Sequence, residues 1–469
     1  MSRFQRLRES KFVRDTFMLQ IGRIGTTALS FVSFWLIVRL MGVEAYGIWK
    51  LVLAFVGIWQ AFDITGIGQL TSTRLAIAVG RKDSRDVLDL MAIYVKVVLV
   101  WALISVVVLF ALGPLVGERL YDRPPLGSLP LLASGRGLLD FMGLNDTGRL
   151  IGTLAGWYAL SIAADTLYTL VIVSLQSRRL MRQLALLQNL NQVVLFVCMV
   201  VAVLVDPRPE SLLVGRLVYS YSTLALAFYV YARLRAEAGV TFPPLGAVFR
   251  RAAGVSLRGY WRTGMAMAFD KNIANLYTQV PITLVGVLAG PAAAGTLGVG
   301  LDVVTRSSLL TGPVLENVQA VVPQAVGRGD FAGLRRNFGR VLVVMAAGAT
   351  AFYVALALAA PLVVPLVFGE DTAPAVPVVV ILSFFGVITA VGGLFGPLYR
   401  AFDLMRSALT VKIIAGLALI VPGLWLISQH GAVGGAWLIN GLYLLSVVLT
   451  AAITLPPLWR RAASANRGV

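Results

Sequence analysis

Residues 40–47 of the chain read LMGVEAYG and residues 288–295 read LAGPAAAG, so a pair of glycines recurs 248 positions later. A second match follows at an offset of 247, with AVGRKD at residues 78–83 and AVGRGD at residues 325–330. A third, LMR at residues 180–182 and 404–406, has an offset of 224 because the first half carries an insertion. Three matches in the same order predict an internal repeat of two similar halves.

The composition of the chain places it in a membrane. Of its 469 residues, 58% are hydrophobic and only 13% are charged, against about 25% charged residues in an ordinary soluble domain. The mean hydropathy is +0.83, and a soluble protein could not bury so much apolar surface. A single cysteine, Cys198, and a single histidine, His430, exclude disulfide frameworks and most thiol, histidine and metal chemistry. We therefore expect an all-α polytopic membrane protein with no cofactor and no metal.

Twelve stretches are long and apolar enough to cross a bilayer as helices of about 20 residues. They lie at residues 17–40, 46–72, 87–113, 152–176, 184–205, 210–232, 263–289, 294–320, 340–368, 374–399, 408–428 and 431–455. An even number of spans puts both termini on one side, and 28 of the 40 Lys and Arg residues lie in the termini and turns of that side. Because basic residues gather on the cytoplasmic side, we predict cytoplasmic N- and C-termini.

The repeat and the spans together predict two six-helix lobes with a central substrate cavity between them. The boundaries expected are a cytoplasmic basic amphipathic segment at 1–16, an N-lobe at 17–232 with an outer loop at 114–151, a cytoplasmic interlobe linker at 233–262, a C-lobe at 263–455 and a cytoplasmic basic tail at 456–469. The first segment has no secretory cleavage site, and it is either a helix on the anionic lipids of the inner leaflet or a disordered charged tail. Sidedness accounts for the net charge of +18, so nucleic acid is not expected as a partner.

Charged side chains inside spans are costly in lipid and therefore indicate a cavity or a pathway. Arg23 in the first span and Lys271 in the seventh differ by 248 positions, so they are equivalent in the two lobes. Two cations that face each other would form an anion site, and Asn275 extends the polar stripe one turn beyond Lys271. The predicted anion-binding residues are Arg23, Lys50, Lys271, Asn275 and Arg306, and the candidate ion-coupling acids are Asp63, Asp165, Asp270, Asp302 and Glu316.

Structural interpretations compete with these functional ones. Lys50 and Arg216 lie about one turn from the outer surface, so their side chains could extend to the interface. Asp302 and Arg306 have the spacing of an intrahelical ion pair and could neutralise each other. Asp165, like Asp63 and Glu316, could instead hold structural hydrogen bonds.

The run RLMGVEAYG at residues 39–47, followed by FDITGIG at 62–68 and TRLA at 73–76, resembles the opening of the polysaccharide-export oligosaccharide flippases. These proteins belong to the multidrug/oligosaccharidyl-lipid/polysaccharide exporter superfamily. Met41 and Thr65 are small departures from the family's pattern.

The resemblance implies alternating-access translocation of an undecaprenyl-diphosphate-linked oligosaccharide from the cytoplasmic to the periplasmic leaflet of a bacterial inner membrane. The cargo would be a repeat unit of lipopolysaccharide or exopolysaccharide. Further expectations are proton or sodium coupling and contact with polysaccharide polymerase or export machinery.

Several other classes of membrane protein share parts of this pattern. A multidrug or cation-coupled exporter of the same superfamily is the nearest alternative, although a cation-binding cavity would favour acids where spans 1 and 7 carry basic residues. A lipid II flippase implies two more spans, and a major-facilitator transporter needs an Asp-Arg pair where Ile77 and Ala78 stand. A polysaccharide polymerase or ligase should not show two equal halves, so we expect a transporter and not an enzyme.

Overall fold

The structure is a computed structural model, and every regular element within its described residues is a helix. Ten of these helices are long and apolar enough to cross a membrane, which confirms the expected all-α polytopic membrane fold. The described residues are 11–63, 66–121, 147–178, 180–235, 242–257, 261–307, 314–315, 318, 321–322, 325–326 and 328–465.

The chain divides into two compact units that are discontinuous in sequence. Unit 1 holds the described residues within 1–41, 59–122 and 145–272, and unit 2 holds those within 42–58 and 273–469. Residues 42–58, which include the first half of the second predicted span, therefore pack with the C-terminal part of the chain.

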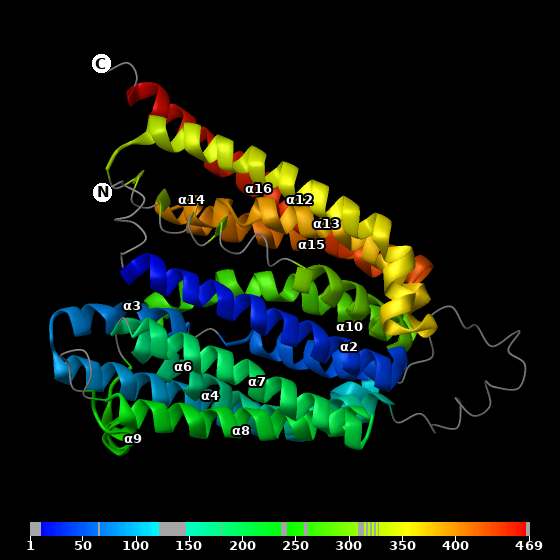
Figure 1. The fold of residues 1–469 in the computed structure, drawn as a ribbon, viewed down its shortest axis with the longest axis horizontal. Helices are drawn as coiled ribbons and strands as arrows, with labels where there is room; N and C mark the ends of the chain where they lie inside the picture. Colours follow the sequence, from blue (N-terminus) through cyan, green and yellow to red (C-terminus); the bar gives the residue numbers. More distant parts are fainter. Residues whose placement is uncertain are drawn as a thin grey trace, which may run out of the picture. The chain divides into compact units, whose positions relative to one another are not determined.

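Unit 1 is built around helices that lie side by side along their length (Figure 1). Its helices are the first part of α2 (Lys11–Gln60), then α3 (Ile67–Gly80), α4 (Ser84–Tyr121), α6 (Thr147–Ser177), α7 (Met181–Val205), α8 (Pro209–Arg233) and α9 (Leu245–Gly254). Glycines allow α4 and α6 to come close, since a Cβ on Gly152 would strike the carbonyl of Gly113. Fully buried side chains such as Met91, Leu170 and Tyr231 fill the core.

Unit 2 contains the second half of α2 and all the later long helices. These are α10 (Trp261–Arg306), whose first part up to Asn272 belongs to unit 1, and α12 (Phe331–Phe368), η3 (Glu370–Ala375), α13 (Val376–Gly392), α14 (Phe395–Ala401), α15 (Met405–His430) and α16 (Ala432–Ala465). Helix α13 packs on α12 and α16, and α15 packs on α16.

Helices α2 and α10 each join two predicted spans through a one-residue kink. Gly42 has φ 76° and ψ 169°, and Gly290 has φ 86° and ψ 173°. Only glycine adopts this conformation readily, and the two kinks lie at the offset of 248 that the sequence repeat gives. The spans therefore meet at a single glycine where the sequence analysis placed short turns.

The backbone also repeats at the second pair of matched segments. Lys82 and Gly329, at an offset of 247, both have positive φ, of 55° and 71°. The amide of Asp83 donates to the carbonyl of Ala78 at 3.1 Å, and the amide of Asp330 donates to the carbonyl of Ala325 at 3.1 Å. The same turn thus closes equivalent helices in both halves of the chain.

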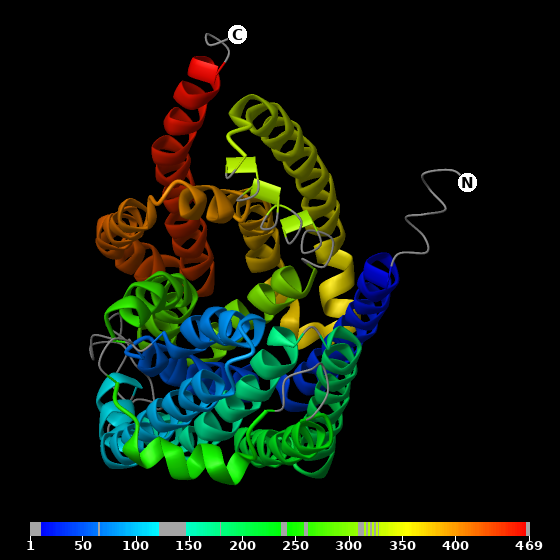
Figure 2. The same cartoon turned by 90° about the vertical axis from the view of Figure 1, so that its left-hand side faces the viewer.

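The last part of the expected linker is docked on unit 1. Figure 2 shows α9 running across the direction of the long helices, and its own side chains Val248 and Ala252 are buried. Lys96 on α4 donates to the carbonyls of Ala253 (3.3 Å) and Val255 (2.9 Å), which closes the C-terminal end of α9. A hydrogen bond from Arg251 to Asp89 at 2.6 Å fixes the helix further and raises the pKa of the Arg251 guanidinium.

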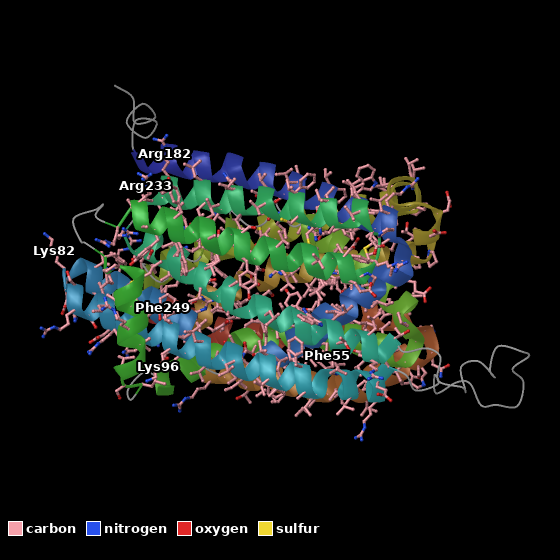
Figure 3. The ribbon with its side chains drawn as sticks, turned by 90° about the horizontal axis from the view of Figure 1, so that it is seen from below. Phe55, Lys82, Lys96, Arg182, Arg233 and Phe249 are labelled. Atoms are coloured by element: carbon pink, nitrogen blue, oxygen red, sulfur yellow. The ribbon has the colours of Figure 1, made fainter. Side chains whose placement is uncertain are left out.

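Basic side chains mark one end of unit 1. Figure 3 shows Lys82, Arg182 and Arg233 at one end of the helices, and Lys96 and Phe249, which lies on α9, toward the same end. The predicted cytoplasmic turns therefore meet at one end of this unit, as the positive-inside pattern requires.

Candidate functional site

Three of the predicted site residues meet in unit 2, where the second half of α2 packs on the second half of α10. They are Lys50, Asp302 and Arg306, and Tyr46 joins them. We call these four residues the Asp302 cluster.

Asp302 is the centre of the cluster. Its Oδ1 accepts a hydrogen bond from Lys50 Nζ at 2.8 Å, its Oδ2 accepts one from the hydroxyl of Tyr46, and Arg306 Nη2 lies 3.7 Å from Oδ2. The side chains of Lys50 and Asp302 are only 12% and 15% exposed. Lys50 is therefore held in an ion pair and does not extend to the interface.

The surrounding backbone makes room for this pair. A Cβ on Gly298 would lie 2.7 Å from Lys50 Cγ, so this glycine lets the lysine side chain cross α10. At about 1.5 Å per residue, Lys50 lies about 12 Å along α2 from the Gly42 kink, and Asp302 lies about 18 Å along α10 from the Gly290 kink.

The cluster combines two cations with one acid. Lys50 and Arg306 both contact the single carboxylate of Asp302. Lysine and arginine are also the side chains that bind phosphate oxygens with charge-assisted hydrogen bonds.

The cluster departs from the repeat, and this departure is the signal that the sequence analysis did not use. The equivalents of Tyr46 and Lys50 are Ala294 and Gly298, and those of Asp302 and Arg306 are Ala54 and Ile58. Both halves of the chain thus contain the equivalent helix positions, but the polar side chains occur at only one of each pair of equivalent positions. Comparing the two halves position by position would have added Tyr46 to the predicted site.

Asn275, a predicted anion-binding residue, holds two helices together. Its Nδ2 donates to the carbonyl of Gly57 on α2 at 3.1 Å, and its Oδ1 accepts from Gln279 Nε2 at 3.4 Å. A Cβ on Gly57 would lie 2.9 Å from Gln279 Cγ. Asn275 and Gln279, on the polar face of the seventh predicted span, therefore contact the second half of α2.

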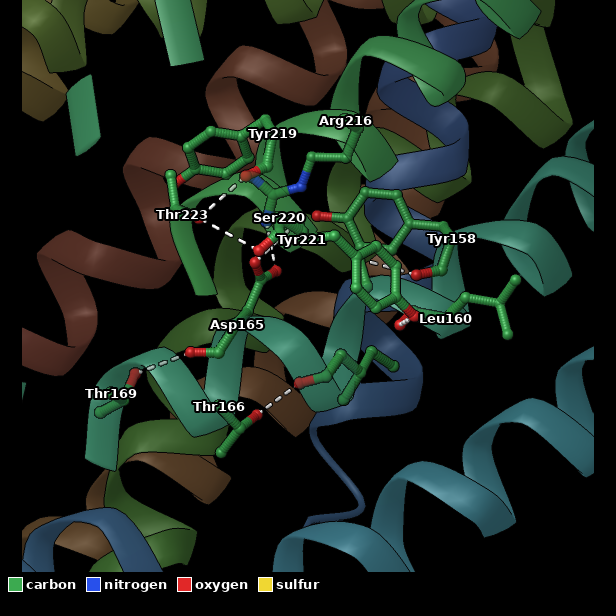
Figure 4. A network of polar contacts seen from close by, with 12 residues as sticks. Tyr158, Leu160, Asp165, Thr166, Thr169, Arg216, Tyr219, Ser220, Tyr221 and Thr223 are labelled. Carbon is green, nitrogen blue, oxygen red and sulfur yellow. Dashed lines mark hydrogen bonds and ion pairs between the residues drawn. The ribbon is translucent and has the colours of Figure 1, made fainter. Parts of the chain in front are cut away.

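A second polar group lies inside unit 1, where Asp165 on α6 meets α8 (Figure 4). Asp165 accepts hydrogen bonds from Arg216 Nη2 at 2.5 Å and from Ser220 Oγ at 2.8 Å. The Arg216 guanidinium also lies 5.4 Å from the ring centroid of Tyr158 and 4.9 Å from that of Tyr219. We call these five residues the Asp165 cluster, and its one acid and one cation neutralise each other.

The remaining predicted residues fall into two groups. Asp63 follows the end of α2 in unit 1, and its carbonyl accepts from Asn272 Nδ2 at 2.8 Å. The side chains of Arg23, Asp270, Lys271 and Glu316 lie outside the described residues. The anion site predicted from Arg23 and Lys271 therefore stays a prediction.

Comparisons with known proteins agree with the fold and with the resemblance noted in the sequence. A family described as polysaccharide biosynthesis protein matches residues 12–323. No curated protein sequence matches the chain.

Solved structures of transporters cover nearly the whole chain. An inward-facing multidrug resistance MATE family transporter of the MOP superfamily has a TM-score of 0.71 at 13% identity, covering 94% of this chain and 96% of its own. The lipid II flippase MurJ in an inward closed conformation has a TM-score of 0.62 at 14% identity, covering 95% and 90%. The eukaryotic MATE transporter AtDTX14 has a TM-score of 0.62 at 14% identity, covering 98% and 99%. The chain therefore has the fold of MOP-superfamily transporters.

Proposed function

The chain belongs to the polysaccharide biosynthesis protein family, and we propose that it is a flippase for undecaprenyl-diphosphate-linked oligosaccharide. It would move this lipid-linked repeat unit from the cytoplasmic to the periplasmic leaflet of a bacterial inner membrane by alternating access. Both termini would then lie in the cytoplasm, and the anionic lipids of the inner leaflet would be further partners.

The observation that carries this proposal is that two cations, Lys50 and Arg306, converge on one carboxylate in the Asp302 cluster. A lipid-linked diphosphate keeps its tail in lipid, but its anionic head cannot cross the hydrocarbon unaided. Lys50 and Arg306 supply two donors suited to phosphate oxygens. Arg23 and Lys271, if they face the same path as predicted, would extend it toward the cytoplasmic side.

The membrane potential supports the same direction of transport. Outward movement of two negative charges across 100 mV would release about 4–5 kcal/mol. Cations that move with the diphosphate would cancel part of this gain. Protons or sodium ions, with Asp63 or Asp270 among the candidate acids, would be further sources of drive.

The test measures lipid-linked glycan translocation in proteoliposomes. We expect Lys50→Met and Arg306→Met each to lower the initial rate about tenfold, because each removes a charge-assisted contact to the head group. Arg39→Met is the matched control, since Arg39 is an exposed cation on the same helix as Lys50, and it should transport at the normal rate. Normal transport by both cluster variants at normal expression would refute the proposed role of the cluster.

Arg23 and Lys271 are tested separately in the same assay. Neutralising either one should also slow transport if the two repeat-equivalent cations bind the head group. Retained transport in both variants would remove them from the mechanism.

The alternative is a multidrug exporter, because the MATE transporters share the fold equally well. In that case Asp302 would bind a cationic drug, and Lys50 would compete with it. A strain that lacks the protein distinguishes the two functions. A flippase predicts accumulation of lipid-linked glycan in the inner leaflet, whereas a drug exporter predicts retention of cationic dye with normal glycan export.

A further inference from the structure

The second half of α2, which follows the Gly42 kink, and the second half of α10, which follows the Gly290 kink, cross with a local twofold symmetry. A Cβ on Gly47 would strike the carbonyl of Pro291, and a Cβ on Gly295 would strike the carbonyl of Val43. Gly47 and Gly295 are repeat equivalents at an offset of 248, and so are Val43 and Pro291. The same backbone contact is therefore made twice, once in each direction, and we call it the glycine crossing.

The Asp302 cluster joins the same two helices, with Lys50 about one turn beyond Gly47 and Asp302 about two turns beyond Gly295. Tyr46 and Lys50 on α2 both bond to Asp302 on α10. Asp302 is the group through which α10 holds these two side chains of α2. Arg306, one turn further along α10, contacts the same carboxylate.

We propose that Asp302 is a gatekeeper residue, an internal anion that binds Lys50 and Arg306 until a substrate phosphate displaces it and releases the glycine crossing. The proposal rests on the proposed function for the identity of the displacing anion. We call the contacts of Asp302 with Tyr46, Lys50 and Arg306 the lock. The lock consists of this chain's own contacts and does not depend on the proposed function.

The exchange follows from the chemistry of the groups. A carboxylate and a phosphate oxygen compete for the same ammonium and guanidinium donors. When a phosphate takes Lys50, Asp302 loses its shortest ionic contact and keeps Tyr46 and the more distant Arg306. The two helices then lose the ionic contact of Lys50 and keep the glycine crossing, the Tyr46 hydrogen bond and the hydrogen bond from Asn275 to Gly57, which are weaker than a charge-assisted contact.

The asymmetry of the cluster favours this interpretation over a purely structural ion pair. Packing alone would be satisfied by small residues, as it is at the equivalents Ala294, Gly298 and Ala54. A buried ion pair is often no more stabilising than apolar residues of similar size. A lock that yields to an anionic cargo requires these charges, because only cargo of the right charge can replace Asp302. It would prevent outward opening of the empty protein.

The experiment measures how often the crossing opens in the full-length protein in liposomes. Cys198→Ala removes the one native cysteine, and Ala294→Cys places a reporter at a fully buried position next to Gly295. The rate of labelling by a membrane-impermeant maleimide from the outer side reports opening. Asp302→Asn and Tyr46→Phe are compared with Asp206→Asn, which makes the same chemical change at a side chain that is 45% exposed.

We expect Asp302→Asn to raise the labelling rate about tenfold without any ligand, because it removes a charge-assisted contact. Tyr46→Phe should raise it less, and Asp206→Asn should leave it unchanged. Tyr46→Phe keeps the lock testable if Asp302→Asn does not fold, since it removes only one hydroxyl. Wild-type labelling rates in every cluster variant that folds would overturn the proposal.

The displacing anion is tested with farnesyl diphosphate, and uncharged farnesol is the control. Farnesyl diphosphate should speed labelling of the protein that retains Asp302 and should have no further effect on Asp302→Asn. If Asp302→Asn opens the crossing but the two farnesyl compounds act alike, the lock is supported and the anionic substrate is refuted. Failure of the lock and failure of the proposed anionic substrate therefore give different results.

Discussion

Replacing Asp165 by asparagine should destabilise unit 1 by about 2–3 kcal/mol. The change leaves the Arg216 guanidinium between two tyrosine rings without its carboxylate partner. Removing one partner of a buried ion pair costs about 3–5 kcal/mol, and exposed pairs cost about 1 kcal/mol or less. The side chains of Asp165 and Arg216 are 32% and 19% exposed, which places the cost between these limits.

The double variant Asp165→Asn/Arg216→Met distinguishes an ion pair from two independent contributions. Without either charge, the site loses one hydrogen bond and some packing, so it should be destabilised by only about 1–2 kcal/mol. Arg216→Met alone should cost about as much as Asp165→Asn. The two substitutions should therefore be coupled by about 3 kcal/mol.

The assay is unfolding of the reconstituted protein in denaturant, with Ser220→Ala as the control that removes one hydrogen bond and no charge. A double variant as unstable as the sum of its single variants would refute the reasoning. Transport decides the remaining question about Asp165. A structural pair predicts normal transport per folded molecule in the double variant, whereas an ion-coupling acid predicts that transport is lost.

Two other features of the structure make testable predictions. Gly42→Ala and Gly290→Ala should each lower the free energy of unfolding by about 1–3 kcal/mol, because both glycines have positive φ. Gly25→Ala is the control and should leave stability unchanged or raise it, since a Cβ on Gly25 would meet open space. Equal unfolding midpoints for the three variants would contradict this prediction. Lys96→Met should free the C-terminal end of α9, so limited proteolysis should cut the chain after Gly254 several times faster than in the control variant Arg85→Met. Equal cleavage rates in the two variants would show that Lys96 does not hold the helix.

The helical spans could be predicted from the sequence because they depend on local composition. Apolar length defined the spans, and the matched segments placed Gly42 and Gly290 in equivalent positions before their backbone angles were known. The structure also shows that one glycine is enough to join two spans, which hydropathy cannot distinguish from a short turn. In both cases the glycine itself was visible in the sequence, but its conformation was not.

The pairing of the charges could not be predicted, because helical periodicity shows which residues share a face and not which helix that face meets. Lys50 and Asp302 are 252 positions apart, and their contact depends on residues 42–58 packing with the later part of the chain. Asp165 and Arg216, 51 positions apart, were likewise identified as intramembrane charges without their partners. The spacing of Asp302 and Arg306 was interpreted correctly as a contact, but Lys50 lies closer to the carboxylate.

The two clusters show why the balance of charge, and not the presence of charge, indicates function in this fold. In the Asp165 cluster one acid meets one arginine, and Ser220 satisfies the remaining carboxylate oxygen, so the charges of the pair balance. In the Asp302 cluster two cations, Lys50 and Arg306, meet one acid. The equivalent positions of the repeat hold alanine, glycine and isoleucine, so the helix crossing itself does not require these charges. Charged groups that the scaffold does not require are best explained by a ligand, and two cations on one acid favour an anionic one.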